Sequence, residues 1–213
     1  MLAEAETDNT KSMEYLDKAI FNLRTAMRNS RPDSISQIHY MLGKSYFYKD
    51  KLSSTSYYAD LVVKYLNLAI NEGYVSDDIP LLLGLSYAAL GETDKSISAF
   101  TEALLVREND ILLFNIAKQY LVRVIDTSEN EELLIKAHVL LAQIDISENN
   151  LSEAEQEFLA LLSKNDNIAD AHYGLGVIYE KNGDSVKARS EWRKCLKLQA
   201  DHAGALSKMS DFK

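Results

Sequence analysis

The alternation of large, small and polar residues is clearest between residues 170 and 200. Large apolar or aromatic side chains recur there every three or four positions, which is the spacing of one face of an α-helix. Gly183 followed by Asp184 interrupts the pattern, so two short helices are predicted. Gly176 lacks a Cβ atom and lets two helix backbones approach closely. The segment is therefore expected to be a pair of tightly packed helices.

The same pattern occurs again upstream, which predicts that the chain is built from repeats. One upstream copy is nearly complete, and a weaker one has Asp145 where the others have Tyr. A third copy is split by an insertion of about seven residues, and half a copy precedes it. The residues that define these copies are Leu83, Gly84, Tyr87, Gly91, Ser96, Phe100 and Ala103; His138, Leu141, Ala142, Ala154, Phe158 and Leu161; Leu42, Gly43, Tyr46, Val62, Leu66 and Ala69; and Ala19, Leu23 and Ala26.

These residues resemble the tetratricopeptide repeat family, in which a helix with Leu-Gly and Tyr pairs antiparallel with a helix carrying Ala, an aromatic residue and another Ala. The resemblance covers most of residues 12 to 210. It implies an all-α fold, a right-handed superhelical array of antiparallel helix pairs, or α-solenoid, in a single domain over residues 1–213. It also implies that the concave groove of the array is the usual ligand surface.

The boundaries of the repeats follow from the helical pattern and from capping signals. Residues 1–10 are expected to be disordered. Helical repeats are expected over residues 11–32 (half a repeat), 36–72, 77–108, 135–166 and 169–200, with a capping helix over 202–211.

Three local features are also predicted. Asp33 or Ser34 is expected to cap the helix that begins near residue 35. Residues 51–71 are expected to form one long helix, because the insertion adds about two turns, and this extension carries Tyr57 and Tyr58. Ser152 and Glu155 are expected to form a capping box.

Residues 110–125 do not fit the repeat. Their sequence, ILLFNIAKQYLVRVI with its preceding Asp, confines the polar groups to one narrow stripe. A helix that is apolar on most sides must be covered on most sides. We therefore predict one extra, non-repeat helix that is buried on at least two sides, bridges the repeats before and after it, and changes the direction of the superhelix. If this helix is exposed instead, it is a partner-binding surface.

Charge and hydropathy narrow the function classes. The net charge of −9 argues against nucleic-acid binding, which needs a basic surface. No run of 18 apolar residues occurs, so membrane insertion is not expected. The N-terminus does not resemble a signal peptide, and a cytoplasmic location is expected if Met1 is the native start.

Residues with catalytic or metal-binding chemistry form no recognisable motif. Phosphate-binding loops, nucleophile elbows and zinc motifs are all missing from the sequence. His39, His138 and His172 occupy equivalent repeat positions and should each face their own helix partner, so they are predicted to be packing groups. Cys195 occupies a small-residue packing position and is expected to be a buried, inert thiol. The chain is therefore predicted to be non-enzymatic, with no cofactor and no metal.

A partner-binding groove is the remaining candidate site. The side chains that should face it are Tyr40, Lys44, Phe47, Leu81, Leu85, Val139, Gln143, Tyr173 and Val177. The best-known groove of this family clamps a carboxylate with Lys and Asn residues on successive repeats. Leu81 and Leu85 interrupt such a set here, so a chaperone-type carboxylate clamp is rejected.

Two function classes follow from this groove. The preferred hypothesis is an adaptor or assembly scaffold that binds a peptide or helix of a partner protein. The alternative is a homo-oligomerising structural subunit, in which Tyr57 and Tyr58 or an end face pairs with another copy. An accessory domain of a larger complex is a third possibility, because such repeats are commonly one part of a longer chain.

Overall fold

The structure, a computed structural model, describes residues 9–29, 34–107 and 110–211. Within these ranges every regular element is helical and no strand occurs. The predicted all-α class and the array of helix pairs are confirmed. None of the described helices has the length and apolar character needed to cross a membrane.

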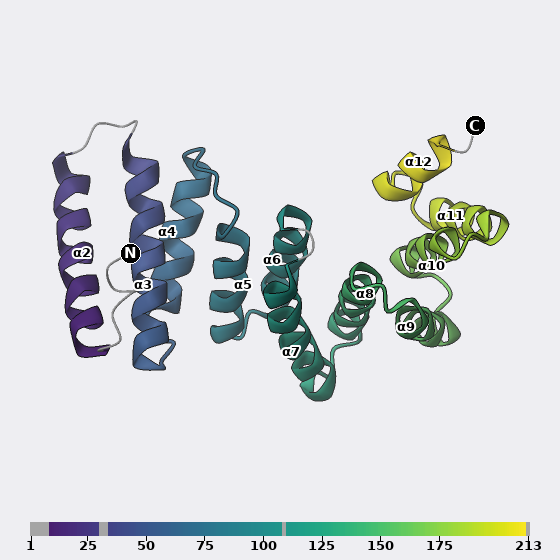
Figure 1. Ribbon diagram of the computed structural model, residues 1–213, viewed down its shortest axis with the longest axis horizontal. Helices are drawn as coiled ribbons and strands as arrows, with labels where there is room; N and C mark the ends of the chain where they lie inside the picture. The colour runs from purple at the N-terminus through teal and green to yellow at the C-terminus, as the bar shows by residue number, and fades with distance from the viewer. Residues whose placement is uncertain (1–8, 30–33, 108–109, 212–213) are drawn as a thin grey trace. The chain divides into compact units, whose positions relative to one another are not determined.

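The chain divides into two compact units, residues 1–108 and residues 109–213. Each helix of the first unit packs against the next one along the chain, and α3 also contacts α5 (Figure 1). The helices of this unit are α2 (Asn9–Asn29), α3 (Ile35–Ser53), α4 (Ala59–Asn71), α5 (Ile79–Ala89) and α6 (Thr93–Val106).

The second unit repeats this arrangement of neighbouring helices, with an additional contact between α8 and α10. Its helices are α7 (Ile111–Thr127), α8 (Glu131–Ser147), α9 (Leu151–Lys164), α10 (Ala169–Lys181), α11 (Ser185–Leu198) and α12 (Ala203–Ser210). The single domain and the right-handed superhelix expected from the sequence stay predictions.

Close helix packing is built on small residues, as the sequence pattern indicated. A Cβ atom added at Gly176 of α10 would lie 2.2 Å from Nε1 of Trp192 on α11. Trp192 is fully buried, together with Ala188 and Cys195 on the same helix. Burial raises the pKa of the Cys195 thiol to about 11, so the thiolate, its reactive form, is disfavoured.

The prediction of one long helix over residues 51–71 is wrong. Helix α3 ends at Ser53 and α4 begins at Ala59, so the insertion forms a loop over residues 54–58. Ser54 has a left-handed φ of 51°, and the next amide, of Thr55, donates to the Asp50 carbonyl at 3.1 Å. This closes the end of α3 in the way typical of helix C-termini. The Ser53 hydroxyl donates to the Lys49 carbonyl at 2.8 Å, and such local bonds compete with helix propagation.

Two predictions about helix starts also need correction. Helix α9 begins after Asn150 with no side-chain cap, so Ser152 and Glu155 form no capping box. Ser34 occupies the N-cap position of α3 but makes no capping hydrogen bond, and Asp33 lies outside the described residues.

The predicted disorder of the N-terminus is wrong where the structure describes it. Asn9 and Thr10 are helical, because α2 already begins at Asn9. The rest of that segment, residues 1–8, lies outside the described residues.

Helix α7 is the predicted extra helix, but it buries a single face. The buried residues are Leu113, Phe114, Ala117, Leu121 and Val124. Ile111 and Leu112 are each 69% exposed, so the prediction of burial on at least two sides is wrong. Lys118 pairs with Asp145 of α8 at 2.7 Å and with Glu148, which directs the buried face toward α8. The bridging role and the change in superhelix direction stay predictions.

The histidines are packing groups that also carry a hydrogen bond, which the sequence analysis missed. His138 and His172 face Glu157 and Glu191 on the paired helix at 2.8 and 2.7 Å. His39 faces Glu72 in the same way at 2.7 Å. Across the part of the chain that the structure describes, no three His, Cys, Asp or Glu side chains are arranged to hold a metal ion.

Candidate functional site

Five of the predicted groove residues lie together in the first unit. Tyr40, Lys44 and Phe47 are spaced four and three residues apart and share one face of α3. Leu81 and Leu85 share one face of the neighbouring helix α5. All five side chains are partly exposed. Their role in a binding groove stays a prediction.

These five residues form what we call the α3–α5 surface. At its polar end, a network of hydrogen bonds surrounds the Asp78 carboxylate. Its carboxylate accepts hydrogen bonds from the Tyr40 hydroxyl at 2.8 Å, from Lys44 at 2.9 Å and from the Ser76 hydroxyl at 2.7 Å. Lys44 is therefore already neutralised by an internal partner. An incoming carboxylate would have to displace Asp78, which supports the rejection of a carboxylate clamp.

The network also sets the pKa of the groups within it. Burial disfavours the charged forms, but the hydrogen bonds and the mutual attraction of the two charges outweigh it. The pKa of Lys44 is therefore raised and the pKa of Asp78 is lowered from its usual value near 3.8. Burial also raises the pKa of Tyr40, which stays a neutral hydrogen-bond donor at neutral pH.

Asp78→Asn is expected to lower the stability of the first unit at neutral pH and to flatten its acid dependence. Because the folded-state pKa of Asp78 lies below its unfolded value, the carboxylate contributes stability above about pH 4, and this is lost as the pH falls through the folded pKa. Urea unfolding between pH 2.5 and pH 7 measures the effect. Asp77→Asn, at the exposed neighbouring position, is the control and should retain the wild-type pH profile. Identical acid dependence of Asp78→Asn and wild type would contradict the network.

The apolar end of the same surface contains a small pocket of about 110 Å³. Phe47 of α3, Leu85 and Ala89 of α5 and Ala59 at the start of α4 supply its apolar wall. The rest of the lining is polar and consists of Asp50, Lys51, Thr55, Ser56 and Ser86. Lys51 lies over the ring of Phe47, at 5.4 Å from the ring centre. The pocket has room for one apolar side chain of a partner rather than for a whole small-molecule ligand.

The four predicted groove residues of the second unit are less accessible as a set. Val139 is only 8% exposed and belongs to the core of that unit. Tyr173 packs against α12, where a Cβ added at Gly204 would lie 2.7 Å from its ring, and its ring centre is 4.7 Å from that of His202. Gln143 and Val177 are partly exposed. A role in binding stays a prediction for all four.

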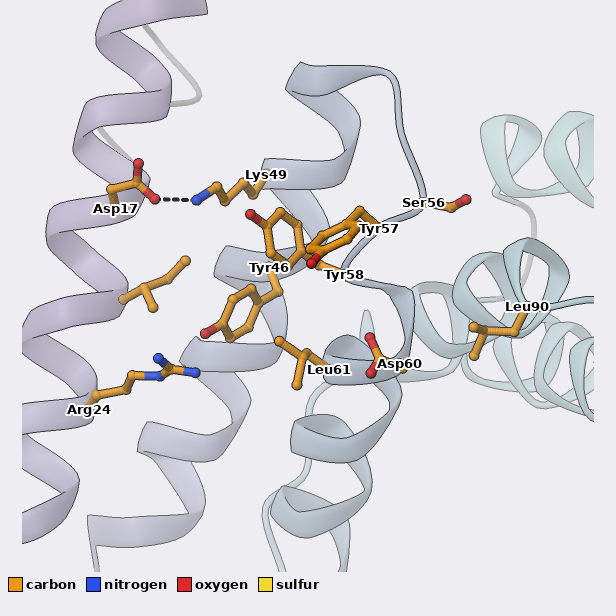
Figure 2. Close-up of a pocket in the computed structure, with 11 residues that line it drawn as sticks. Asp17, Arg24, Tyr46, Lys49, Ser56, Tyr57, Tyr58, Asp60, Leu61 and Leu90 are labelled. Atoms are coloured by element: carbon orange, nitrogen blue, oxygen red, sulfur yellow. Dashed lines mark hydrogen bonds and ion pairs between the residues drawn. The ribbon is translucent and has the colours of Figure 1, made fainter.

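A larger cleft, which no sequence pattern predicted, lies on the other side of the loop over residues 54–58. The cleft has a volume of about 730 Å³ and is open to solvent. It is lined by residues of α2, of the second half of α3, of the loop and of the start of α4 (Figure 2). Its lining comprises Asp17, Ile20 and Arg24 of α2, Tyr46 and Lys49 of α3, Ser56, Tyr57 and Tyr58 of the loop, Asp60 and Leu61 of α4, and Leu90. Ser56 lines both this cleft and the pocket beside Phe47, so the loop is the wall between them.

Asp50 holds the loop in place. Its carboxylate oxygens accept the backbone N–H of Tyr58 at 3.0 and 3.1 Å, and one of them also accepts the Thr55 hydroxyl at 3.2 Å. Tyr58 is thereby positioned with its ring centre 5.4 Å from that of Tyr46. The Tyr57 ring stands at 89° to the Tyr58 ring, 4.9 Å away, and forms the outer corner of the cleft.

Asp50→Ala is expected to cost about 1–3 kcal/mol of stability, because the Asp50 side chain is buried and the Tyr58 N–H would lose its acceptor. The exchange of the Tyr58 amide should accelerate, which hydrogen exchange measures directly. Asp77→Ala removes an exposed carboxylate from the same unit and should change neither quantity. An unchanged Tyr58 exchange rate in Asp50→Ala would show that Asp50 does not anchor the loop.

Comparison with protein-family models matches residues 81–110 and residues 139–194 to tetratricopeptide repeats. Comparison with curated proteins gives no significant match. The first match lies mainly in the first unit and the second lies within the second unit.

Several solved structures are similar to the chain at low identity. YrrB, described as a tetratricopeptide repeat protein with an unusual peptide-binding site, is 20% identical, with 94% of this chain and 86% of that chain covered and a TM-score of 0.40. MamA from Desulfovibrio magneticus is 15% identical, with coverage of 76% and 97% and a TM-score of 0.33. The P58(IPK) repeat domain is 10% identical, with coverage of 95% and 65% and a TM-score of 0.42.

The family matches agree with the helix pairs and with the small-residue packing described above. Proteins of this family bind other proteins and are generally non-enzymatic. The helical repeats recognised in both units show that the chain is a tetratricopeptide repeat protein.

Proposed function

We propose that the chain is a non-enzymatic adaptor or assembly scaffold that binds a peptide or helix of a partner protein on the face formed by α3 and α5. The observation that carries the proposal is the small pocket between Phe47 and Leu85, where these side chains form an apolar wall together with Ala59 and Ala89. Leu81 lies one helical turn from Leu85 and extends the apolar surface along α5. A partner segment would place one apolar side chain in the pocket and others along this stripe.

The polar network beside the pocket favours an apolar contact over a charged one. Lys44 and Asp78 satisfy each other, so neither offers an unpaired charge to a ligand. Burying one leucine-sized side chain contributes about 1.5–3 kcal/mol, so an anchor in the pocket accounts for about a tenfold to hundredfold change in affinity.

Selection of random peptides displayed on phage against the full chain tests the proposal. Selected peptides should share a leucine, isoleucine, methionine or phenylalanine at one position. Their affinity, measured by isothermal titration calorimetry, should fall at least about tenfold with Leu85→Asp. Leu105→Asp, on α6 at a position that is 73% exposed, is the matched control and should leave the affinity unchanged. Peptides that bind Leu85→Asp as tightly as wild type would place the binding surface elsewhere.

Self-association is the second candidate function. Phe21 on α2 and Tyr57 in the loop are 70% and 79% exposed, which is unusual for large aromatic side chains and is compatible with a contact between copies. Size-exclusion chromatography with light scattering distinguishes the two functions. A mass that rises with concentration and falls to the monomer value in a Phe21→Ser or Tyr57→Ser variant would favour the structural-subunit function.

A further inference from the structure

The cleft behind the loop has the size of a ligand site and lies apart from the pocket that carries the proposed function. Its volume of about 730 Å³ falls within the usual range for such sites. The loop over residues 54–58 separates it from Phe47 and Leu85, which do not line it. A ligand in the cleft would therefore leave the α3–α5 surface accessible.

Cations already lie over the aromatic rings of this cleft. The Arg24 guanidinium is 5.8 Å from the centre of the Tyr46 ring, and the Lys49 ammonium is 5.0 Å from the centre of the Tyr58 ring. Both distances are within the range in which a cation is attracted to the face of a ring. Lys49 is in addition paired with Asp17, so its charge is balanced within the cleft.

Among the aromatic and acidic side chains that line the cleft, Tyr57 and Asp60 have no cation of the described residues as a partner. Tyr57 is 79% exposed, and no Lys or Arg of the described residues lies over its ring. Asp60 is exposed in the first turn of α4, and no cation in the described part of the chain pairs with it. An aromatic face and a carboxylate on the same cleft wall are the two groups that recognise a basic side chain.

The distribution of charge favours a cation at this wall. Figure 2 shows Arg24 extending from the α2 side and Asp60 lying on the α4 side, with Tyr46 and Tyr58 between them. The internal cations therefore lie toward α2, away from Asp60. The net charge of −9 also attracts basic segments over longer distances.

We propose that this cleft binds an arginine or lysine side chain of a partner segment, with the Tyr57 ring contacting the cation and the Asp60 carboxylate pairing with it. The site is distinct from the α3–α5 surface. A partner that carries both an apolar anchor and a basic residue would bind the chain on both sides of the loop. Each site should also bind independently, the α3–α5 surface an apolar peptide and the cleft a basic peptide.

Titration of the ¹⁵N-labelled full chain with acetyl-Gly-Arg-Gly-amide, followed by NMR at low salt, tests the proposal. Amide shifts should concentrate at residues 56–61 and should shrink as salt is added. Tyr57→Ala and Asp60→Asn should each weaken the apparent affinity about twofold to fivefold, which is the effect of one exposed cation contact. Tyr15→Ala, at a partly exposed tyrosine of α2, and Asp77→Asn are matched controls and should bind as wild type does.

Two further probes decide the chemistry of the site. Acetyl-Gly-Ala-Gly-amide should produce no shifts at residues 56–61, and equal shifts would show that the cation is not recognised. Larger shifts with acetyl-Gly-Glu-Gly-amide would overturn the proposal in favour of an anion site at Arg24. The Leu85→Asp variant should bind the arginine peptide as wild type does. Loss of apolar-peptide binding on the α3–α5 surface can therefore be distinguished from loss of arginine binding in the cleft. No shift at residues 56–61 with any probe would also overturn the proposal.

Discussion

Replacing Phe114 by alanine is expected to lower the free energy of unfolding by about 3–5 kcal/mol. The Phe114 side chain is 3% exposed and lies at the centre of the buried face of α7, beside Leu113 and Ala117. Truncation to alanine removes the ring from a packed environment and leaves a cavity that the surrounding helices can fill only in part. Chemical denaturation monitored by circular dichroism measures the loss.

Leu112→Ala is the matched control for this prediction. Leu112 precedes Phe114 by two positions on the same helix and is 69% exposed, so its truncation should change the stability by less than about 0.5 kcal/mol. If instead Leu112→Ala were the more damaging change, the face of α7 that the structure buries would be the wrong one. A small effect of both substitutions would indicate that α7 adds little to the core.

Two irregularities of the sequence turn out to be one feature of the structure. Asp145 stands where the other repeat copies have tyrosine, and Lys118 belongs to the one helix outside the repeat pattern. The two side chains form an ion pair at 2.7 Å, and Lys118 also pairs with Glu148. The burial of Lys118 disfavours its charge, but its bonds to the two carboxylates outweigh this and raise its pKa. The non-repeat helix α7 is thus joined to α8 at the position where this repeat copy has a carboxylate instead of tyrosine.

The repeat helices were predictable because their signal is local and redundant. The helix pair predicted between residues 170 and 200 is present as α10 and α11, since helical spacing and small-residue positions within the segment point to the same elements. The structure of the insertion after α3 was harder to predict, because the length of an insertion does not indicate whether the extra residues extend a helix or form a loop. The run of Ser53, Ser54, Thr55 and Ser56 was the available signal, and Asp50 converts it into an ordered loop.

The two candidate sites also differ in how far the sequence could predict them. The helix face that carries the proposed α3–α5 surface could be chosen from the sequence, because positions expected to face a groove recur in each helix pair. Its role in binding stays a prediction. The cleft could not be predicted, because it depends on Asp50 holding the loop so that the Tyr58 ring contacts Tyr46, with Tyr57 beside Tyr58. Burial of α7 was overestimated for a related reason. Counting apolar residues shows how much surface a helix could bury, whereas the neighbours present decide how much it does bury.

Gly176→Ala is expected to destabilise the second unit by about 2 kcal/mol, although alanine is the better helix former. The new Cβ would lie 2.2 Å from Nε1 and 2.4 Å from Cδ1 of Trp192, so the whole fully buried indole ring would have to shift within the core. Gly84→Ala is the matched control, because its Cβ would lie 3.2 Å from the Phe100 ring, a contact that small shifts relieve. Its net effect should be close to zero, since the gain in helix propensity offsets the mild crowding.

The pattern of hydrogen exchange in Gly176→Ala tests how damage spreads along the chain. Each helix contacts mainly its neighbours along the chain, so the damage should stay local. Amide exchange is expected to become faster in α10, α11 and α12 and to stay unchanged in α2 to α5 of the first unit. The Trp192 indole N–H should exchange faster as well, because the ring is the group displaced. A uniform loss of protection over both units would mean that the chain unfolds as one cooperative body, and would contradict the division into units that the helix contacts indicate.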